Sequence, residues 1–296
     1  MIQINLKIGI LTYKIILILL HEGVVYEMNR RNSILILFIL FGTVQTATAL
    51  ERDRLGLVKE GELSLITGAE YREGDYGTPD STSLLRIPFS VTYRKTNFSL
   101  FASIPLLFAS SDGDIIINSK TSMPKMTAPS GSGKNTEAGI GDTLLSASYY
   151  LTPDYRQETE YRLTAIYKLA TADEDKGLGT GEDDYAFEAG IAKNIDEYIL
   201  SGTLGYEING DSPDYTYNDV LYGTAGLTKQ LPGYTQIGSY LTVSQALTDT
   251  TDAPLELSLF YSQPVAKARN LYLYVSKGFS DGSPDFALGG NIQFDY

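Results

Sequence analysis

The most restrictive feature of this sequence is a period-two alternation of apolar and polar residues in successive segments. In the last segment Phe286, Leu288 and Ile292 fall on one side, whereas Asn291 and Gln293 fall on the other. A period of two places these two sets on opposite faces of a β-strand. Strands of about ten residues with one apolar and one polar face are typical of a barrel with lipid outside and water inside. The sequence therefore predicts an all-β fold, a transmembrane antiparallel up-and-down β-barrel.

Twelve segments follow this pattern, and the connections between them alternate in length. Short connections such as 194–197 alternate with mostly longer ones such as 109–138 and 172–183. Short periplasmic turns and longer extracellular loops are usual in outer-membrane barrels. A secreted β-sandwich also has many short strands, but it does not explain this alternation. The predicted strands are 61–71, 84–94, 97–108, 139–151, 159–170, 184–193, 198–209, 219–229, 235–246, 255–265, 270–279 and 285–296.

Two short apolar stretches precede the predicted strands. After Met28, a basic segment leads into the apolar residues 33–42 and then into small residues at 47–49. This order is that of a cleavable secretory signal, and its apolar core is too short to cross a membrane. We expect residues 1–27 to come from a mis-assigned upstream start, 28–49 to be a signal peptide and 50–296 to be one barrel domain in the bacterial outer membrane. An inner-membrane anchor within 1–27 is the alternative, but it requires a longer apolar span.

The composition excludes several kinds of chemistry. The net charge of −13 disfavours nucleic acid as a partner. The only histidine, His21, lies in the predicted leader, and the chain has no cysteine. Catalytic triads that use histidine or cysteine, histidine-ligated zinc and thiol redox chemistry are therefore excluded from the predicted barrel. We expect no enzyme, no metal and no cofactor.

The second and third predicted strands allow their register to be predicted. A two-residue turn at 96–97 places Tyr93 opposite Leu100, with apolar pairs outside and polar pairs inside. The same register sets Pro88 opposite Pro105. Proline cannot donate to a β-ladder, so two prolines at one height predict a local gap or bulge in the wall. The gap could be a lateral opening for apolar solutes, or the bulge could lie near the outer rim, where loops or water satisfy the neighbouring carbonyl groups.

Two sequence blocks between residues 139 and 194 resemble a known family. The first begins Gly-Ile-Gly-Asp-Thr-Leu at 139–144, and the second combines Lys-Leu-Ala-Thr at 168–171 with a glycine-rich stretch and Asp-Tyr at 184–185. These blocks resemble the outer-membrane transporter family associated with the meta-pathway of phenol degradation. Ala170 stands where that family usually has proline, and Ala172 where it has glycine. The resemblance implies a channel or transporter for small, often hydrophobic or aromatic, compounds.

The inward-facing positions supply the candidate solute contacts. Twelve strands are expected to enclose a narrow passage, because eight are usually filled by side chains and sixteen leave a wide channel. The arginines are predicted to form a basic patch opposite the carboxylates. The alternative is that these charges only pair with one another to satisfy a polar lumen. The candidate lumen residues are Arg86, Arg94, Phe101, Arg162, Lys168, Glu188, Glu207 and Phe260.

The longest loop, 109–138, contains the apolar triplet Ile115, Ile116 and Ile117. An apolar triplet in a solvent loop predicts either a constriction folded into the lumen or a hairpin that extends above the membrane. The sequence favours neither.

The tyrosines and the terminal aromatic residue suggest how the barrel meets the membrane. Tyrosines near strand ends are predicted to lie at lipid headgroups. The last residue, Tyr296, resembles the C-terminal signal that the barrel-assembly machinery reads in outer-membrane proteins. The tyrosines assigned to these girdles are Tyr71, Tyr93, Tyr149, Tyr198, Tyr222, Tyr240, Tyr272 and Tyr296.

Together these features predict an outer-membrane channel or transporter for small molecules, with hydrophobic or aromatic compounds as the solutes that the resemblance implies. The alternatives are a non-specific narrow porin and a structural or adhesive barrel. The expected partners are outer-membrane lipid, lipopolysaccharide, the barrel-assembly machinery and a small-molecule solute. The sequence does not predict the oligomeric state.

Overall fold

The computed structural model describes residues 4–8, 11–15, 61–76, 81–111, 115–118, 123–126, 135–152, 158–211 and 216–296. The chain divides into two units, Met1–Ile36 and Leu37–Tyr296. The first unit contains an antiparallel hairpin of β1 (Ile4–Ile8) and β2 (Leu11–Ile15). The predicted signal peptide at 28–49 lies outside the described residues.

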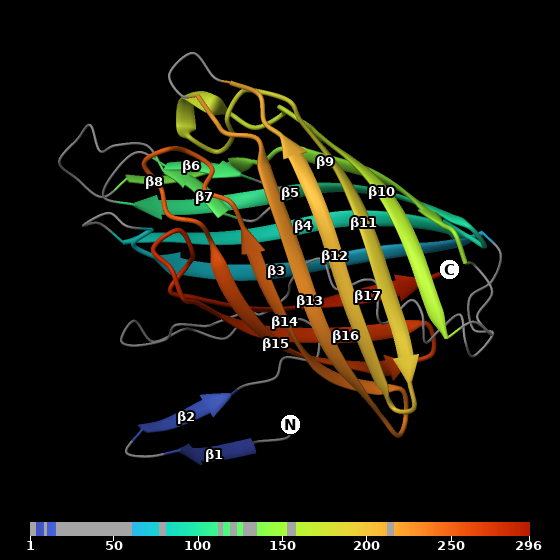
Figure 1. Cartoon of the computed structure of the whole chain (residues 1–296). Coiled ribbons are helices and arrows are strands. Elements are labelled where there is room, and N and C mark those ends of the chain that lie inside the picture. The colour runs from blue at the N-terminus through green and yellow to red at the C-terminus, as the bar shows by residue number, and fades with distance from the viewer. Residues whose placement is uncertain are drawn as a thin grey trace. The chain divides into compact units, whose positions relative to one another are not determined.

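Thirteen strands of the second unit form one antiparallel sheet (Figure 1). Neighbouring strands pair around the sheet, and the last strand pairs back with β3, which closes the sheet into a barrel. Because β8 and β9 both pair with β5 and share one position, the barrel has twelve strand positions, as predicted. The strands are β3 (Glu62–Gly74), β4 (Thr82–Lys95), β5 (Phe98–Ser111), β8 (Asn135–Ile140), β9 (Thr143–Tyr150), β10 (Thr159–Leu169), β11 (Asp184–Ile195), β12 (Tyr198–Ile208), β13 (Val220–Leu231), β14 (Thr235–Ser244), β15 (Leu255–Ala266), β16 (Arg269–Gly278) and β17 (Phe286–Asp295).

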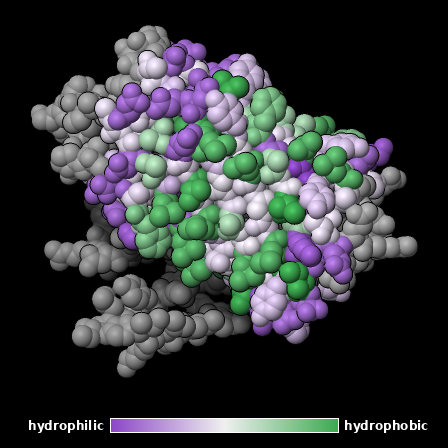
Figure 2. All heavy atoms as spheres, viewed as in Figure 1, coloured by the Kyte–Doolittle hydropathy of each residue, from purple (hydrophilic) through white to green (hydrophobic). Residues whose placement is uncertain are grey.

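The alternation in the sequence corresponds to the two faces of the wall. On β12 the exposed side chains Leu200, Leu204 and Tyr206 alternate with the buried Ile199 and Glu207. The other strands follow the same rule, so large apolar side chains cover the outside of the barrel. On the face shown in Figure 2, hydrophobic and near-neutral residues cover the middle of the wall, and hydrophilic residues gather toward its ends. Such a surface matches a bilayer, whose core offers apolar contacts and no water.

The predicted hairpin register is confirmed. Residues Lys95 and Phe98 flank the two-residue turn, and Tyr93 lies opposite Leu100. The pairing keeps the apolar side chains of both strands on the outside, because a shift by one residue would turn them all inward. The register also sets Pro88 opposite Pro105.

The predicted fourth strand at 139–151 is wrong in one respect, because it is not continuous. It is interrupted after Ile140 and resumes at Thr143. The long loop before it contains a separate hairpin of β6 (Ile115–Asn118) and β7 (Met123–Met126). The side chains of the isoleucine triplet Ile115–Ile117 lie outside the described residues, so the choice between a constriction and an external hairpin stays a prediction.

Within the described residues, the single helical element is a short 3-10 turn, Glu174–Lys176. None of the described helical structure has the length and apolar character that a membrane-spanning helix requires.

Candidate functional site

The barrel wall is irregular beside the proline pair. On β5, Leu106 pairs with Ile140 of β8, whereas Ser103 pairs with Leu144 of β9. Two β5 residues therefore face three residues, 141–143, of the broken strand, which defines a β-bulge. The extra residue does not leave the backbone unsatisfied, because the Gly141 N–H donates to the Pro105 carbonyl oxygen at 2.9 Å. The bulge places a proline and a glycine at the same point in the wall.

A seam in the ladder begins at this bulge. Strand β9 pairs with β10 as far as Thr143 and Leu169. Beyond this point β8 pairs with β5, and the described strands include no partner for its other edge. We call this edge, on the side of β10, the β8 seam. In a membrane barrel each strand normally pairs on both sides, because lipid cannot satisfy free N–H and C=O groups. The seam is thus the least regular part of the described wall.

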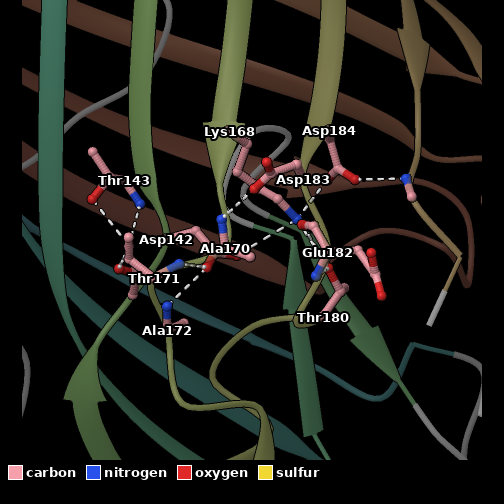
Figure 3. A network of polar contacts seen from close by, with 12 residues as sticks. Asp142, Thr143, Lys168, Ala170, Thr171, Ala172, Thr180, Glu182, Asp183 and Asp184 are labelled. Carbon is pink, nitrogen blue, oxygen red and sulfur yellow. Dashed lines mark hydrogen bonds and ion pairs between the residues drawn. The ribbon is translucent and has the colours of Figure 1, made fainter. Parts of the chain in front are cut away.

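A buried ion network lies where the ladder of β9 and β10 ends, beside the seam (Figure 3). We call it the Lys168 network; it consists of Lys168, Asp142, Asp184 and Thr180. Lys168, near the end of β10, has no exposed side-chain surface. Its Nζ lies 2.6 Å from Asp184 Oδ2 and 3.5 Å from Asp142 Oδ2, and it donates to Thr180 Oγ1 at 3.0 Å. A buried ammonium group requires such partners, because burial without them is strongly unfavourable.

The carboxylates of this region also hold the loop that follows β10. Asp142 Oδ1 accepts hydrogen bonds from the N–H groups of Thr171 and Ala172, each at 3.0 Å. Asp183 Oδ1 accepts from the Ala170 N–H at 2.9 Å. The Tyr167 hydroxyl also donates to Asp183, and this bond holds the pKa of the Asp183 carboxyl below its usual value. These side chains replace the strand partners that the loop backbone lacks.

The two sequence blocks that carry the family resemblance meet in the Lys168 network. Asp142 comes from the first block, and Lys168 and Asp184 come from the second. The sequence predicted Lys168 as a solute contact in the lumen. The structure instead encloses it completely, and its contacts assign it to holding the loop against the end of the barrel wall.

The same loop inserts one apolar side chain into the barrel. Leu178 is buried and packs against the inward-facing Leu84, Leu107 and Ala109 of β4 and β5. It occupies space that a side chain at position 139 would need, because a Cβ on Gly139 would lie 2.7 Å from Leu178 Cδ1. Leu178 therefore fills the inner side of the wall next to the β8 seam.

The predicted lumen arginines lie inside, but Arg86 and Arg94 do not form one basic patch. Arg86 is buried and lies opposite Glu70 on β3. Arg94 lies eight residues further along β4, about 26 Å away. There its guanidinium donates to the Tyr150 hydroxyl at 3.1 Å and lies 4.3 Å from that ring's centroid. Each arginine has its own polar partners, because a polar lumen wall must satisfy its charges locally.

Arg72, which is not among the predicted lumen residues, belongs to the charged group around Arg86. It forms an ion pair with Glu70, and its Nη1 lies 3.1 Å from Glu256 Oε2. All these side chains are buried. The alternation of faces would have found Arg72, because β3 extends to Gly74 and keeps even-numbered residues inside.

The remaining candidates also face inward but are dispersed. The Tyr222 hydroxyl donates to Glu188 Oε1 at 2.6 Å, and Glu207 is fully buried. Phe101 is half-buried on β5, and Arg162 lies opposite Gly190. Phe260 belongs to a buried aromatic cluster with Tyr240, Tyr272 and Tyr274. Whether these residues contact a solute stays a prediction.

The assignment of some tyrosines to lipid girdles is wrong. Tyr240 and Tyr272 are buried inside the barrel, and Tyr222 faces inward to Glu188. Their parity identifies them, because the outward-facing Leu241 and Leu273 are their immediate neighbours. In contrast, Tyr149 is exposed as predicted.

A closed barrel of this kind, with an apolar outside and a polar inside, defines an outer-membrane β-barrel. The family model described as putative MetA-pathway of phenol degradation matches residues 80–296. The chain therefore belongs to this family. No curated protein sequence matches the chain significantly.

Solved structures support the fold. An outer membrane channel from Pseudomonas putida F1 is 12% identical with a TM-score of 0.62, and the match covers 81% of this chain and 97% of that one. The monoaromatic hydrocarbon channel CymD is 13% identical with a TM-score of 0.45, covering 84% and 92%. The P. putida toluene transporter TodX is 10% identical with a TM-score of 0.39, covering 82% and 90%. The fold assignment rests on the first of these.

Proposed function

We propose that this barrel is an outer-membrane channel for small hydrophobic molecules, including aromatic ones, and that it is not an enzyme. The observation that carries the proposal is the inner wall, where apolar surfaces lie beside charged groups. Leu84, Leu107 and Leu178 form one apolar surface, and Phe260 and its tyrosine neighbours form another. A purely structural barrel or an open porin does not require apolar surfaces inside. The names of the solved channels for aromatic hydrocarbons agree with this solute class.

Solute flux into liposomes that carry the refolded chain tests this function. We expect saturable entry of small neutral aromatics and slow entry of sugars of similar size. Flux graded by size alone would instead assign a non-specific narrow porin. A folded barrel with no flux for any solute would contradict the proposal and favour a structural or adhesive role, which binding of the exposed loops to cells or matrix would then test.

The β8 seam is the proposed lateral opening through which an apolar solute leaves the barrel wall. Three features support it: Pro88 opposite Pro105, the bulge at Gly141 and the missing ladder between β8 and β10. The loop that carries Leu178 fills the inner side of this region. Movement of this loop would uncover the apolar surface next to the seam without breaking a continuous ladder.

A disulfide that fixes the loop tests the lateral opening. The Oγ atoms of Thr143 and Thr171 lie 3.0 Å apart at the base of the seam. Because the chain has no cysteine, the double variant Thr143→Cys/Thr171→Cys introduces one defined pair. Oxidation should slow the flux of apolar solutes, and reduction should restore it.

The matched control is Ser148→Cys/Thr164→Cys, whose Oγ atoms lie 2.9 Å apart within the regular ladder of β9 and β10. Oxidation of this pair should leave the flux unchanged. If both pairs have the same effect, or neither has one, the seam is not the exit.

We also propose that the barrel interacts with the barrel-assembly machinery and with lipopolysaccharide. The backbone N–H of Tyr296 donates to the Leu63 carbonyl at 2.8 Å. Its side chain is exposed, so the ring is accessible to the assembly machinery. Contact of the loops with lipopolysaccharide follows from their place on the outer rim. Removal of the Tyr296 ring by Tyr296→Ala should lower the amount of assembled barrel in cells.

A further inference from the structure

Aromatic side chains stack on the inner wall across β14, β15 and β16. The ring centroids of Tyr240 and Phe260 lie 5.1 Å apart, with an angle of 23° between the ring planes. Phe260 and Tyr272 follow at 5.5 Å and 24°, and Tyr274 adjoins Tyr272 at 6.1 Å in a tilted arrangement. We call these four side chains the aromatic ladder. Stacking at these distances is the favourable offset geometry of aromatic pairs.

Glycines on the neighbouring strands fix the direction of two of these rings. Tyr240 pairs across the sheet with Gly226, and Phe260 pairs with Gly238. A Cβ at either glycine would lie 2.4 Å from an atom of the opposite ring. Each ring therefore crosses over the adjacent strand, in the space that the missing side chain leaves. The two glycines therefore allow the rings of the aromatic ladder to form an ordered surface on the inner wall.

The three hydroxyl groups inside the aromatic ladder are unpartnered among the described residues. Tyr240, Tyr272 and Tyr274 are 7%, 4% and 7% exposed, and their hydroxyls make no hydrogen bond to any of the described residues. Two tyrosines elsewhere on the inner wall are satisfied, since the hydroxyl of Tyr222 binds Glu188 and that of Tyr150 binds Arg94. An unsatisfied buried hydroxyl is unfavourable, and phenylalanine would fill the same place without this cost. These hydroxyls therefore point to a ligand that provides a partner, and Tyr272, which lies between Phe260 and Tyr274 in the aromatic ladder, carries the central one.

We propose that the aromatic ladder is a binding site for a planar aromatic solute that carries one hydrogen-bonding substituent, such as a hydroxyl group. The solute ring would stack with Phe260 and the tyrosines, and its substituent would exchange a hydrogen bond with the Tyr272 hydroxyl. Both interactions are stronger away from bulk water. This inference rests on the proposed channel function and adds a specific site and a chemical preference to it.

Binding of three probes of similar size to the refolded full chain in detergent tests the proposal. Phenol has the ring and the hydroxyl, benzene has only the ring, and cyclohexanol has only the hydroxyl. We expect phenol to bind at least about fivefold more tightly than either of the others, because one neutral hydrogen bond or one stacking contact corresponds to about that factor.

Three variants separate the two interactions. Tyr272→Phe removes the hydroxyl and keeps the ring, so it should weaken phenol binding about fivefold and leave benzene binding unchanged. Phe260→Leu should weaken the binding of both aromatic probes. The matched control is Tyr161→Phe, because Tyr161 is an exposed tyrosine on the outer face of β10. It should change nothing.

Cyclohexanol binding as tight as that of phenol would overturn the proposal, and so would unchanged phenol binding in Tyr272→Phe. Parallel liposome flux separates these results from a failure of the channel function. If apolar solutes cross selectively and neither Tyr272→Phe nor Phe260→Leu changes their flux, the channel function stands and the proposed binding site is excluded. Phenol binding that depends on Tyr272 in a barrel without flux would keep the site and exclude the channel.

Discussion

Lys168 is the residue that we expect to stabilise the end of β10 most strongly. It is the cation between two buried carboxylates, those of Asp142 and Asp184. Lys168→Met would leave these carboxylates without their positive partner. Loss of one partner from a buried ion pair typically costs about 3–5 kcal/mol, so the free energy of unfolding in urea should fall by about that amount.

The control for this prediction is Lys176→Met in the same loop. Lys176 lies 3.1 Å from Asp173, but both side chains are nearly half exposed. A pair of this kind contributes at most about 1 kcal/mol, so the control should unfold almost like the parent chain. If both variants lose the same free energy of unfolding, the burial of the Lys168 network does not account for its contribution to stability.

At the scale of the strand, Gly141 is the extra residue that produces the bulge. Gly141 and Asp142 are both buried, so the alternation of faces is interrupted at this point. Deletion of Gly141 would bring β8 and β9 into one register with β5 and would restore strict alternation. We expect a continuous strand and slower flux of apolar solutes into liposomes. Unchanged or faster flux would contradict a role for the bulge in the exit.

The register of β4 and β5 could be predicted from sequence because both strands have chemically distinct faces and a short turn. A shift by one residue would move Tyr93 and Leu100 from lipid to the lumen. The break after Ile140 could not be predicted in this way. The segment 139–142 contains two glycines, which do not distinguish the faces, and its path depends on Pro105 in another strand.

In the candidate site, too, contacts between distant segments of the chain could not be predicted from the alternation. The alternation placed Lys168 inside the barrel, but it could not identify Asp142 and Asp184 as its partners, since these come from other segments of the chain. The tyrosine assignment failed for a related reason. Position near a strand end does not determine which face a tyrosine occupies, whereas parity does, and parity places Tyr240 and Tyr272 inside.

In the whole molecule the two rims of the barrel differ in charge. The connections on one rim are mostly longer loops, and those on the other rim are mostly short turns. Among the described residues the turn side has basic and acidic groups together, for example Lys95 and Lys193 with Asp196 and Glu197. On the loop side, exposed carboxylates outnumber the exposed lysines, which are Lys176 and Lys277. The exposed carboxylates among the described loop-side residues are Asp75, Asp173, Glu174, Asp175, Asp211, Asp219, Asp249, Asp252, Asp281 and Asp285.

An acidic rim should make the channel discriminate against anionic solutes. Carboxylates around an entrance create a negative potential that lowers the local concentration of anions. We expect benzoate to enter liposomes more slowly than benzyl alcohol, which has a similar size and no charge. The difference should shrink when the ionic strength rises from 0.1 M to 1 M, since the screening length falls from about 10 Å to about 3 Å.

The triple variant Asp173→Asn/Glu174→Gln/Asp175→Asn should raise benzoate flux relative to benzyl alcohol, because it removes three charges from the loop rim. The double variant Asp196→Asn/Glu197→Gln removes carboxylates from the turn rim and should leave the ratio nearly unchanged. Because the loop rim faces outward in an outer-membrane barrel, this difference between the rims would act on solutes as they approach the cell. An equal change in both variants would mean that net charge, rather than the charge of the loop rim, sets the discrimination.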